Sequence, residues 1–255
     1  MNLRNRGTIE ADEIAFFAKY YANEAYNLAG WHLRMRRDLD SLRRAAGGAR
    51  LKRVLSLGCG EGQFEIMLAP FAEQIIALDI SPEAIEAAKR KAQARGVTNV
   101  DFRCMPLSDL GWDEQFDTVV CLAFLHHVWE PDIPGLLQEI YNHLNMGGFF
   151  YSLDPNVHGV LRKIGRVILG AKYNNYHTPD ERELDPQQLK GTLRAAGFNP
   201  VEIVNIDLTL IPLMFMLKKA PAWLFHVLLG IDWAWCHSPF ARWASGFSAV
   251  ARKNT

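Results

Sequence analysis

The sequence has no surplus of either charge. Lys and Arg together number 28, and so do Asp and Glu, which gives a formal net charge of zero over 255 residues. A protein that binds DNA or RNA usually carries an excess of basic residues, because it must displace the counterions of the phosphates. The composition therefore argues against nucleic acid as the main partner, and we expect none.

Cysteines are few, and long apolar runs are missing. The four cysteines include no CxxC pair, so we expect neither disulfides nor zinc, and we assign no metal ligands. The N-terminus has no apolar signal core. Prolines and charged residues interrupt the apolar stretches near the C-terminus, which leaves no span of about 20 residues that could cross a bilayer. We expect a soluble, cytoplasmic protein.

Short apolar segments typical of strands alternate with segments that have the period of helices. The seven expected strands are 53–57, 74–79, 100–103, 116–122, 148–153, 201–204 and 246–252. One helix should begin after Ser81, which can act as its N-cap because Pro82 follows at the first helical position. The alternation predicts an α/β fold, with a mostly parallel sheet covered by helices on both faces.

We expect a single domain over residues 1–255, because the sequence has no internal repeat and no low-complexity linker. Its expected parts are N-terminal helices in 1–50, a ligand-binding core in 51–154, a lid insertion in 155–185 with a helix over 160–169, and the C-terminal part of the sheet in 186–255 with an apolar insertion at 208–245. Two amphipathic helices are expected over 11–47, separated at Gly30.

Glycines cluster directly after the first expected strand, in Gly58-Cys59-Gly60-Glu61-Gly62. They let the backbone turn sharply and bring a ligand close to bare amides, although a tight turn without a ligand is the alternative. Gln63 stands where a dinucleotide-binding GxGxxG loop would need glycine. Asp79 ends the second strand, at the spacing of an acid that binds two ribose hydroxyls; capping of the next helix is its alternative role.

Together these motifs resemble the class I S-adenosylmethionine-dependent methyltransferases. The resemblance covers about residues 52–153 and rests on Gly58-x-Gly60-x-Gly62, Asp79, Phe116-Asp117-Thr118-Val119-Val120, Leu125-His126-His127-Val128 and Leu144-Asn145-Met146-Gly147-Gly148, in that order. It implies a Rossmann-like, seven-stranded sheet whose last strand is antiparallel. It also implies S-adenosyl-L-methionine as the cofactor.

The resemblance further implies where the cofactor would lie. The residues that would contact it are Gly58, Cys59, Gly60, Gly62, Asp79, Ile80, Met105, Leu107 and Leu122. Asp79 would hold the ribose, and the glycine loop would hold the methionine part. The family often has an acid after the third strand that binds the adenine amino group, and this sequence lacks it. Met105 and Leu107 are therefore assigned to the adenine, with Ser108 or Asp109 as alternatives.

His126 and His127 follow the fourth strand, at the edge where such sheets bind ligands, and they are the candidate catalytic residues. If the acceptor is a hydroxyl, a general base helps to remove its proton, although methyl transfer without a base is the alternative. Holding the loop is the alternative role, more so for His127. Asp154 follows the fifth strand, and we interpret it as the N-cap of a helix from Val157 rather than as a substrate-orienting group. Tyr176 and His177 lie in a polar loop that could close over the site.

The insertion at 208–245 is rich in Trp, Phe, Leu and Met and contains Lys218 and Lys219. A lid, a homodimer surface and a peripheral contact with an anionic membrane are all open interpretations. We expect a methyltransferase for a small acceptor that is apolar or lipid-like, with oxygen favoured as the target atom. A non-catalytic protein of the same fold, a nucleotide-dependent oxidoreductase and an RNA methyltransferase remain as alternatives.

Overall fold

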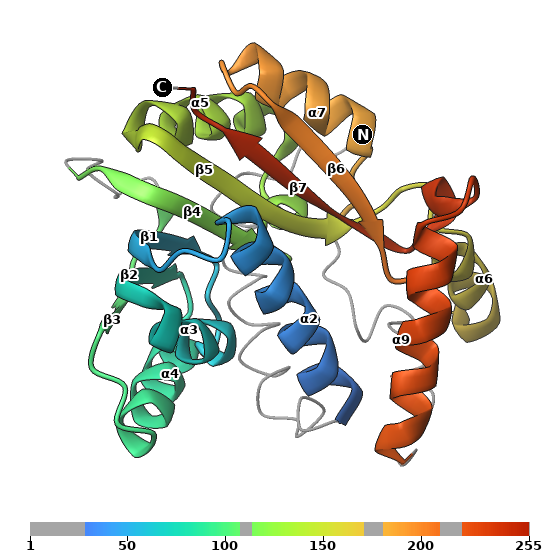
Figure 1. Ribbon diagram of the computed structural model, residues 1–255, viewed down its shortest axis with the longest axis horizontal. Helices are drawn as coiled ribbons and strands as arrows, with labels where there is room; N and C mark the ends of the chain where they lie inside the picture. Colours follow the sequence, from blue (N-terminus) through green and yellow to red (C-terminus); the bar gives the residue numbers. More distant parts are fainter. Residues whose placement is uncertain (1–28, 108–113, 171–180, 210–220, 255) are drawn as a thin grey trace.

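The computed structural model describes residues 29–107, 114–170, 181–209 and 221–254. Its centre is a seven-stranded sheet with the strand order β3-β2-β1-β4-β5-β7-β6 (Figure 1). The strands are β1 Leu51–Leu57, β2 Ala72–Asp79, β3 Val100–Cys104, β4 Phe116–Leu122, β5 Leu144–Pro155, β6 Val201–Ile206 and β7 Gly246–Arg252. Only β7 runs antiparallel to its neighbours, β5 and β6. The Rossmann-like α/β fold and the antiparallel last strand are confirmed.

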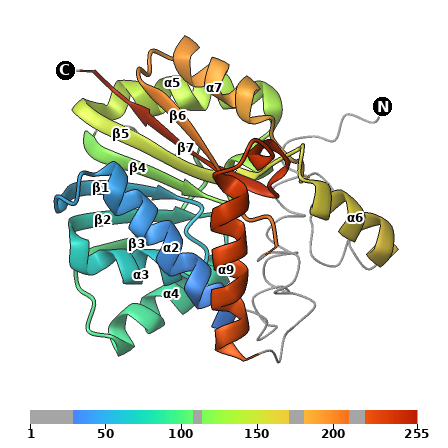
Figure 2. The same cartoon turned by 45° about the vertical axis from the view of Figure 1, so that its right-hand side comes forward.

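Helices cover both faces of the sheet (Figures 1 and 2). Helices α2 (Ala29–Ala45), α3 (Gln63–Leu68) and α4 (Pro82–Ala94) pack against one face, and α5 (Ile133–His143) and α7 (Pro186–Ala195) pack against the other. Because both faces are covered, the central strands are apolar along their length. Val119, Val120 and Cys121 in β4 are all completely buried.

Two inserted helices stand beyond the ends of the strands. Helix α6 (Val160–Leu169) follows β5, and α9 (Ala222–Cys236) lies between β6 and β7. Both lie at the carboxyl edge of the parallel strands, on the right-hand side of Figure 1. Within the described part of the chain, no helix combines the length and apolar character needed to cross a membrane.

Local capping explains where two helices begin. The Ser81 hydroxyl accepts a hydrogen bond from Ala84 N at 3.2 Å, which confirms the predicted start of α4. Helix α7 is capped in the same way by Asp185, which accepts from Gln187 N at 2.7 Å. The prediction at Gly30 was wrong, because α2 begins at Ala29 and includes that glycine. The helix expected before it lies outside the described residues.

A buried ionic cluster joins α2 to the segment that follows β6. Asp207 is completely buried and accepts hydrogen bonds from Arg34 Nε at 3.2 Å and from Arg37. Arg37 also donates to Asp38 Oδ1 at 2.8 Å. Buried charges of this kind are strongly destabilising when one partner is removed, so the cluster fixes α2 against the base of the α9 insertion.

Candidate functional site

The glycine loop between β1 and α3 is held in a conformation that suits glycine. Gly58, Gly60 and Gly62 have φ values of 71°, 52° and 69°. A Cβ on Gly58 would lie 2.4 Å from Phe124 Cδ2, and a Cβ on Gly62 would lie 2.5 Å from a ring carbon of Phe102. The loop therefore packs tightly at its ends. Its shape is also held by its own amides, since Gly58 N and Cys59 N both donate to Leu78 O and Gly62 N donates to Cys59 O.

Asp79 connects this loop to the end of β2. Its Oδ2 accepts a hydrogen bond from Gly60 N at 2.7 Å, and its Oδ1 accepts one from Ser81 N at 2.9 Å. The alternative role of Asp79 as the side-chain cap of α4 is wrong, since Ser81 performs that function. These two bonds fix the Asp79 carboxylate at the carboxyl edge of the sheet, between the glycine loop and the start of α4.

The residues expected to bind the cofactor all lie at the carboxyl ends of four adjacent strands. They are Gly58, Cys59, Gly60 and Gly62 after β1, Asp79 and Ile80 at β2, Met105 and Leu107 after β3, and Leu122 at the end of β4. Met105 N donates to Asp79 O at 3.0 Å, which places the end of β3 beside the acid. A carboxylate, a glycine-rich backbone and apolar side chains are groups that fit a nucleoside with an amino-acid tail. Ser108 and Asp109 lie outside the described residues.

His126 and Asp154 form a buried pair beside this edge. His126 lies in a short 3₁₀ turn, Leu125–His127, and is 5% exposed, while Asp154 in β5 is completely buried. His126 Nδ1 lies 3.1 Å from Asp154 Oδ1, and His126 N donates to the same oxygen at 3.3 Å. Burial raises the pKa of Asp154 to about 7, against the opposing effect of the backbone hydrogen bond from His126.

The interpretation of Asp154 as a helix cap was wrong. Helix α6 begins at Val160, and its N-cap, Gly159, makes no side-chain hydrogen bond. The Asp154 carboxylate contacts His126 instead, in the turn that follows β4, the strand next to β5 in the sheet. The pairing makes Asp154 a positioning group for the His126 ring, and this role was missed from the sequence.

Glu181 is a further residue at this site that the sequence did not reveal. Its Oε1 lies 3.8 Å from His126 Nε2, and Arg182 N donates to His126 O at 3.3 Å. The ring of His127 is 4.1 Å from that of His126, measured between centroids. Ligand atoms of His126, His127 and Glu181 all lie within 4.8 Å of one another, so these three residues could also hold a divalent cation. Tyr176 and His177 lie outside the described residues.

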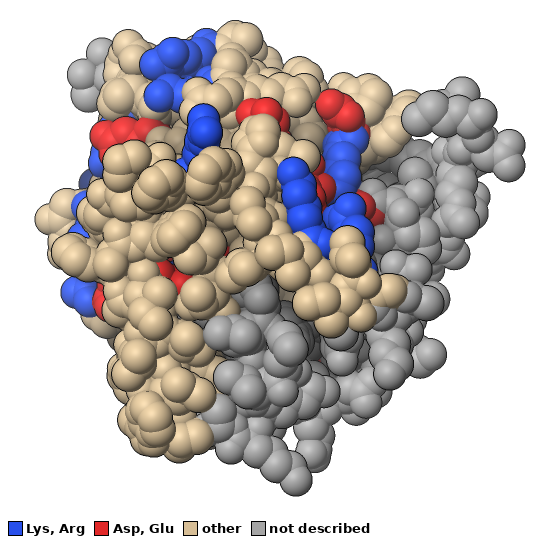
Figure 3. Space-filling model, turned by 90° about the vertical axis from the view of Figure 1, so that its right-hand side faces the viewer, with Lys and Arg blue, Asp and Glu red and all other residues tan. Residues whose placement is uncertain are grey.

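Large apolar side chains are exposed on the helices at the carboxyl edge. On α9 and just after it these are Trp223, Val227, Ile231, Trp233 and Phe240, which we call the α9 surface. The one charged residue of α9, Asp232, is buried and accepts hydrogen bonds from Thr209. In Figure 3, which faces this side, the lower part of the described surface is almost free of charged side chains, and Lys and Arg gather above it.

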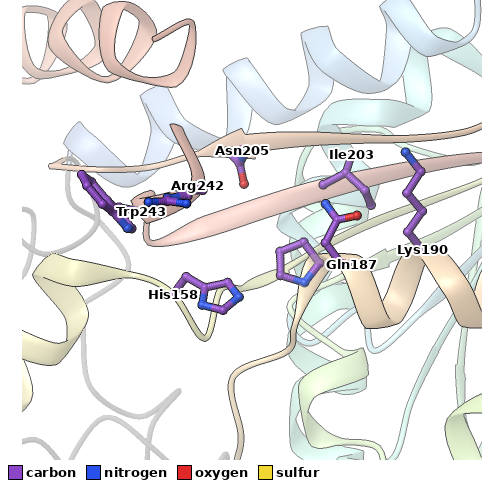
Figure 4. A pocket seen from close by; sticks show the side chains of 8 residues that line it. His158, Gln187, Lys190, Ile203, Asn205, Arg242 and Trp243 are labelled. Atoms are coloured by element: carbon purple, nitrogen blue, oxygen red, sulfur yellow. The ribbon is translucent and has the colours of Figure 1, made fainter. Parts of the chain in front are cut away.

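A cleft of about 470 Å³ opens near the end of β5 (Figure 4). It lies between the segment after β5, the first turn of α7, β6 and the short turn Ala241–Trp243. Its lining residues are His158, Pro186, Gln187, Lys190, Ile203, Asn205, Arg242 and Trp243. None of them was singled out as a site residue from the sequence, because they come together only through the packing of four separate segments.

Known proteins resemble this chain over its central part and in its fold. Residues 54–148 match a family described as "Methyltransferase domain". The ubiquinone biosynthesis O-methyltransferase of Bordetella bronchiseptica is 28% identical over 179 residues, which are 66% of this chain and 71% of that protein. Among solved structures, the N-methyltransferase NodS of Bradyrhizobium japonicum, bound to S-adenosyl-l-homocysteine, has a TM-score of 0.61 at 14% identity and covers 94% of this chain and 97% of its own. The DhpI–SAH complex has a TM-score of 0.62 at 18% identity, covering 98% and 99%.

Proposed function

We propose that this chain is a class I S-adenosylmethionine-dependent methyltransferase and that it methylates an oxygen atom of a small, apolar or lipid-like acceptor; the match of residues 54–148 to a methyltransferase domain supports the first part. The observation that carries the proposal is the buried pair of His126 and Asp154 at the carboxyl edge. An oxygen acceptor needs a group that removes its proton, and a histidine oriented by a carboxylate suits that task. The O-methyltransferase relatives support the choice of oxygen.

We assign separate tasks to the residues on either side of the site. The bound cofactor supplies a methyl group on a positively charged sulfur. The glycine loop and Asp79 hold it, with Ile80, Met105, Leu107 and Leu122 around it. Asp154 accepts the Nδ1–H of His126, which fixes the tautomer whose lone pair is on Nε2, the nitrogen that lies 3.8 Å from Glu181 Oε1. His126 Nε2 would take the proton of the acceptor's hydroxyl, and His127 lies beside the His126 ring.

This assignment can be tested with a radiolabelled methyl donor and alkylcatechols of increasing chain length as acceptors. His126→Gln should lower the turnover rate about 10²- to 10⁴-fold while leaving the affinity for S-adenosylmethionine unchanged. His143→Gln is the matched control, because His143 is a surface residue of α5 that bonds its own helix. A turnover rate of His126→Gln equal to that of the wild type would contradict the base assignment.

The same experiment separates the other functions that the fold allows. Cofactor binding without transfer to any hydroxyl acceptor would favour a non-catalytic protein of this fold. Transfer to amines alone would contradict the choice of oxygen. Transfer to RNA would contradict the expectation drawn from the zero net charge.

We further propose that this is a cytoplasmic protein whose α9 surface rests on an anionic membrane. Trp223 and Trp233 are 65% and 67% exposed, and tryptophans favour the interface between water and lipid. Lys163 and Arg166 on α6 are exposed at the same edge of the sheet and could contact anionic headgroups. A membrane surface there would present a lipid-like acceptor directly to the carboxyl edge.

Vesicle flotation tests this contact. The wild type should float with vesicles that contain phosphatidylglycerol at low ionic strength, and the double substitution Trp223→Ala, Trp233→Ala should abolish flotation. Trp129→Ala is the control, because Trp129 is 48% exposed but lies outside the α9 surface. If the wild type does not float but forms a homodimer, and this dimer dissociates in the double variant, a second copy of the chain covers the α9 surface instead.

A further inference from the structure

We propose that the cleft beside α7 binds a small phosphate ester with an apolar body, at a site that shares no lining residue with the cofactor and acceptor assignments above. The phosphate lies between Arg242 and His158, and the body extends along Ile203 toward Lys190. The proposal does not depend on which acceptor the enzyme methylates. A cleft of about 470 Å³ lies within the size range of small-molecule sites, roughly 300–1,000 Å³.

The lining of the cleft is positively charged. Lys190 and Arg242 are among its residues, whereas none of the described residues that line it is Asp or Glu. Among the described residues, the side chains of these two cations make no ion pair with a carboxylate. The nearby Asp185 is already engaged, because it caps α7 and its Oδ2 lies 3.2 Å from His158 Nε2. An anion that enters the cleft therefore meets two cationic side chains, and at His158 it shares the imidazole ring with Asp185.

One buried side chain holds the two sides of the phosphate position together. Asn156 is completely buried; its Nδ2 donates to Arg242 O at 3.1 Å and to Ala244 O at 2.9 Å. Its Oδ1 accepts from His158 N at 3.0 Å. The backbones that carry Arg242 and His158 are thus fixed relative to each other before any ligand arrives, and such preorganisation lowers the entropic cost of binding.

The side chains divide the cleft into a polar end and an apolar middle. In Figure 4, Arg242 and His158 lie across the cleft from each other, Asn205 points into it, and Lys190 lies at the far end beyond Ile203. The guanidinium of Arg242 lies 5.0 Å from the ring centroid of Trp243, which supports its position. Arginine suits this place because its planar donors match phosphate oxygens.

Ligand-observed NMR titration tests the site, with phenyl phosphate, inorganic phosphate and phenol as the probes. The wild type should bind phenyl phosphate more tightly than either of the other two, because only phenyl phosphate has both the charge and the apolar body. Arg242→Glu should raise its Kd about tenfold or more. Arg194→Glu is the matched control, since Arg194 is exposed on α7 one turn beyond Lys190 and does not line the cleft.

Binding of S-adenosylmethionine is measured in the same variants, so that a misfolded protein or a failure of the methyltransferase assignment is recognised separately. Equal Kd values for phenyl phosphate in the wild type and in Arg242→Glu would overturn the proposal, as would no binding at millimolar concentration. Vesicles that contain phosphatidylglycerol identify the source of the phosphate ester. Loss of both phenyl phosphate and vesicle binding in Arg242→Glu would indicate a lipid headgroup, and loss of phenyl phosphate binding alone would indicate a soluble metabolite.

Discussion

Glu65 is a buried acid next to the glycine loop, and its protonation should make the stability of the protein depend on pH. It lies in α3, is 2% exposed, and accepts a hydrogen bond from Ser56 Oγ at 2.6 Å. Its second oxygen has no hydrogen-bond partner among the described residues. Burial raises the pKa of Glu65 from 4.5 to about 7, and the negative charge of Asp79 contributes in the same direction.

The size and sign of the effect follow from these two values. At about 1.4 kcal/mol for each pKa unit, the difference between 4.5 and about 7 corresponds to about 3 kcal/mol. The unfolded chain loses the proton near pH 4.5, whereas the folded protein keeps it until about pH 7. The resulting stabilisation is therefore complete below pH 4.5 and is lost as the pH rises through about 7.

Glu65→Gln removes this dependence, because an amide does not ionise and can still accept the hydrogen bond from Ser56. Urea unfolding at about pH 5 and about pH 8 gives the free energy of unfolding of both proteins. Relative to the variant, the wild type should lose roughly 2–3 kcal/mol between these two conditions. Other buried acids, such as Asp154, titrate in both proteins and cancel in the difference. Glu73→Gln, at an exposed position of β2, is the control. A difference between wild type and Glu65→Gln that stays constant with pH would refute the reasoning.

Three other substitutions test the loop, its acid and the cluster at α2. Gly58→Ala places a methyl group 2.4 Å from Phe124 Cδ2, so calorimetry should show weaker binding of S-adenosylmethionine. Adding Phe124→Ala should restore part of the lost affinity. Wild-type affinity in the single variant would show that the loop tolerates a side chain. Asp79→Ala removes the acceptor for Gly60 N and should weaken cofactor binding by about 1–3 kcal/mol, while unchanged affinity would exclude the ribose assignment. Asp207→Asn removes the charged partner that buried Arg34 shares with partly buried Arg37 and leaves Asp38 as the carboxylate beside them. It should cost about 3–5 kcal/mol in urea unfolding, and a negligible cost would mean that the cluster does not hold α2 in place.

The elements that were predictable from the sequence are those whose signals are local. The strands of a sheet that is covered on both faces are short apolar runs, and β4 with its buried Val119, Val120 and Cys121 is of this kind. The glycine loop is defined by a single turn between β1 and α3, and Ser81 caps α4 within three residues of its own position. Each of these features could be read without knowing which distant segments pack together.

The parts of the site that were missed depend on contacts between distant segments. His126 and Asp154 were both placed at the carboxyl edge, but their pairing follows from the adjacency of β4 and β5 and from the start of α6 at Val160. Glu181 comes from the end of the lid insertion, and no pattern around it distinguishes it from a solvated acid. The hydrogen bond from Asn156 to Arg242 joins residues that are 86 positions apart in the sequence.

The strand pair β5–β7 separates the β1–β4 half of the sheet from the segments that carry the two inserted helices, α6 and α9. Pro155, the last residue of β5, pairs with Gly246, the first residue of β7, so the chain leaves for α6 and returns from the α9 insertion at one point of the sheet. The proposed cofactor residues all belong to β1–β4 on the other side of β5. A change in the length of either insertion would therefore enter the sheet at this one point, outside the paired register of β1–β4. A change of the insertions at the Pro155–Gly246 pair could in this way alter the acceptor while the cofactor half of the sheet stays the same.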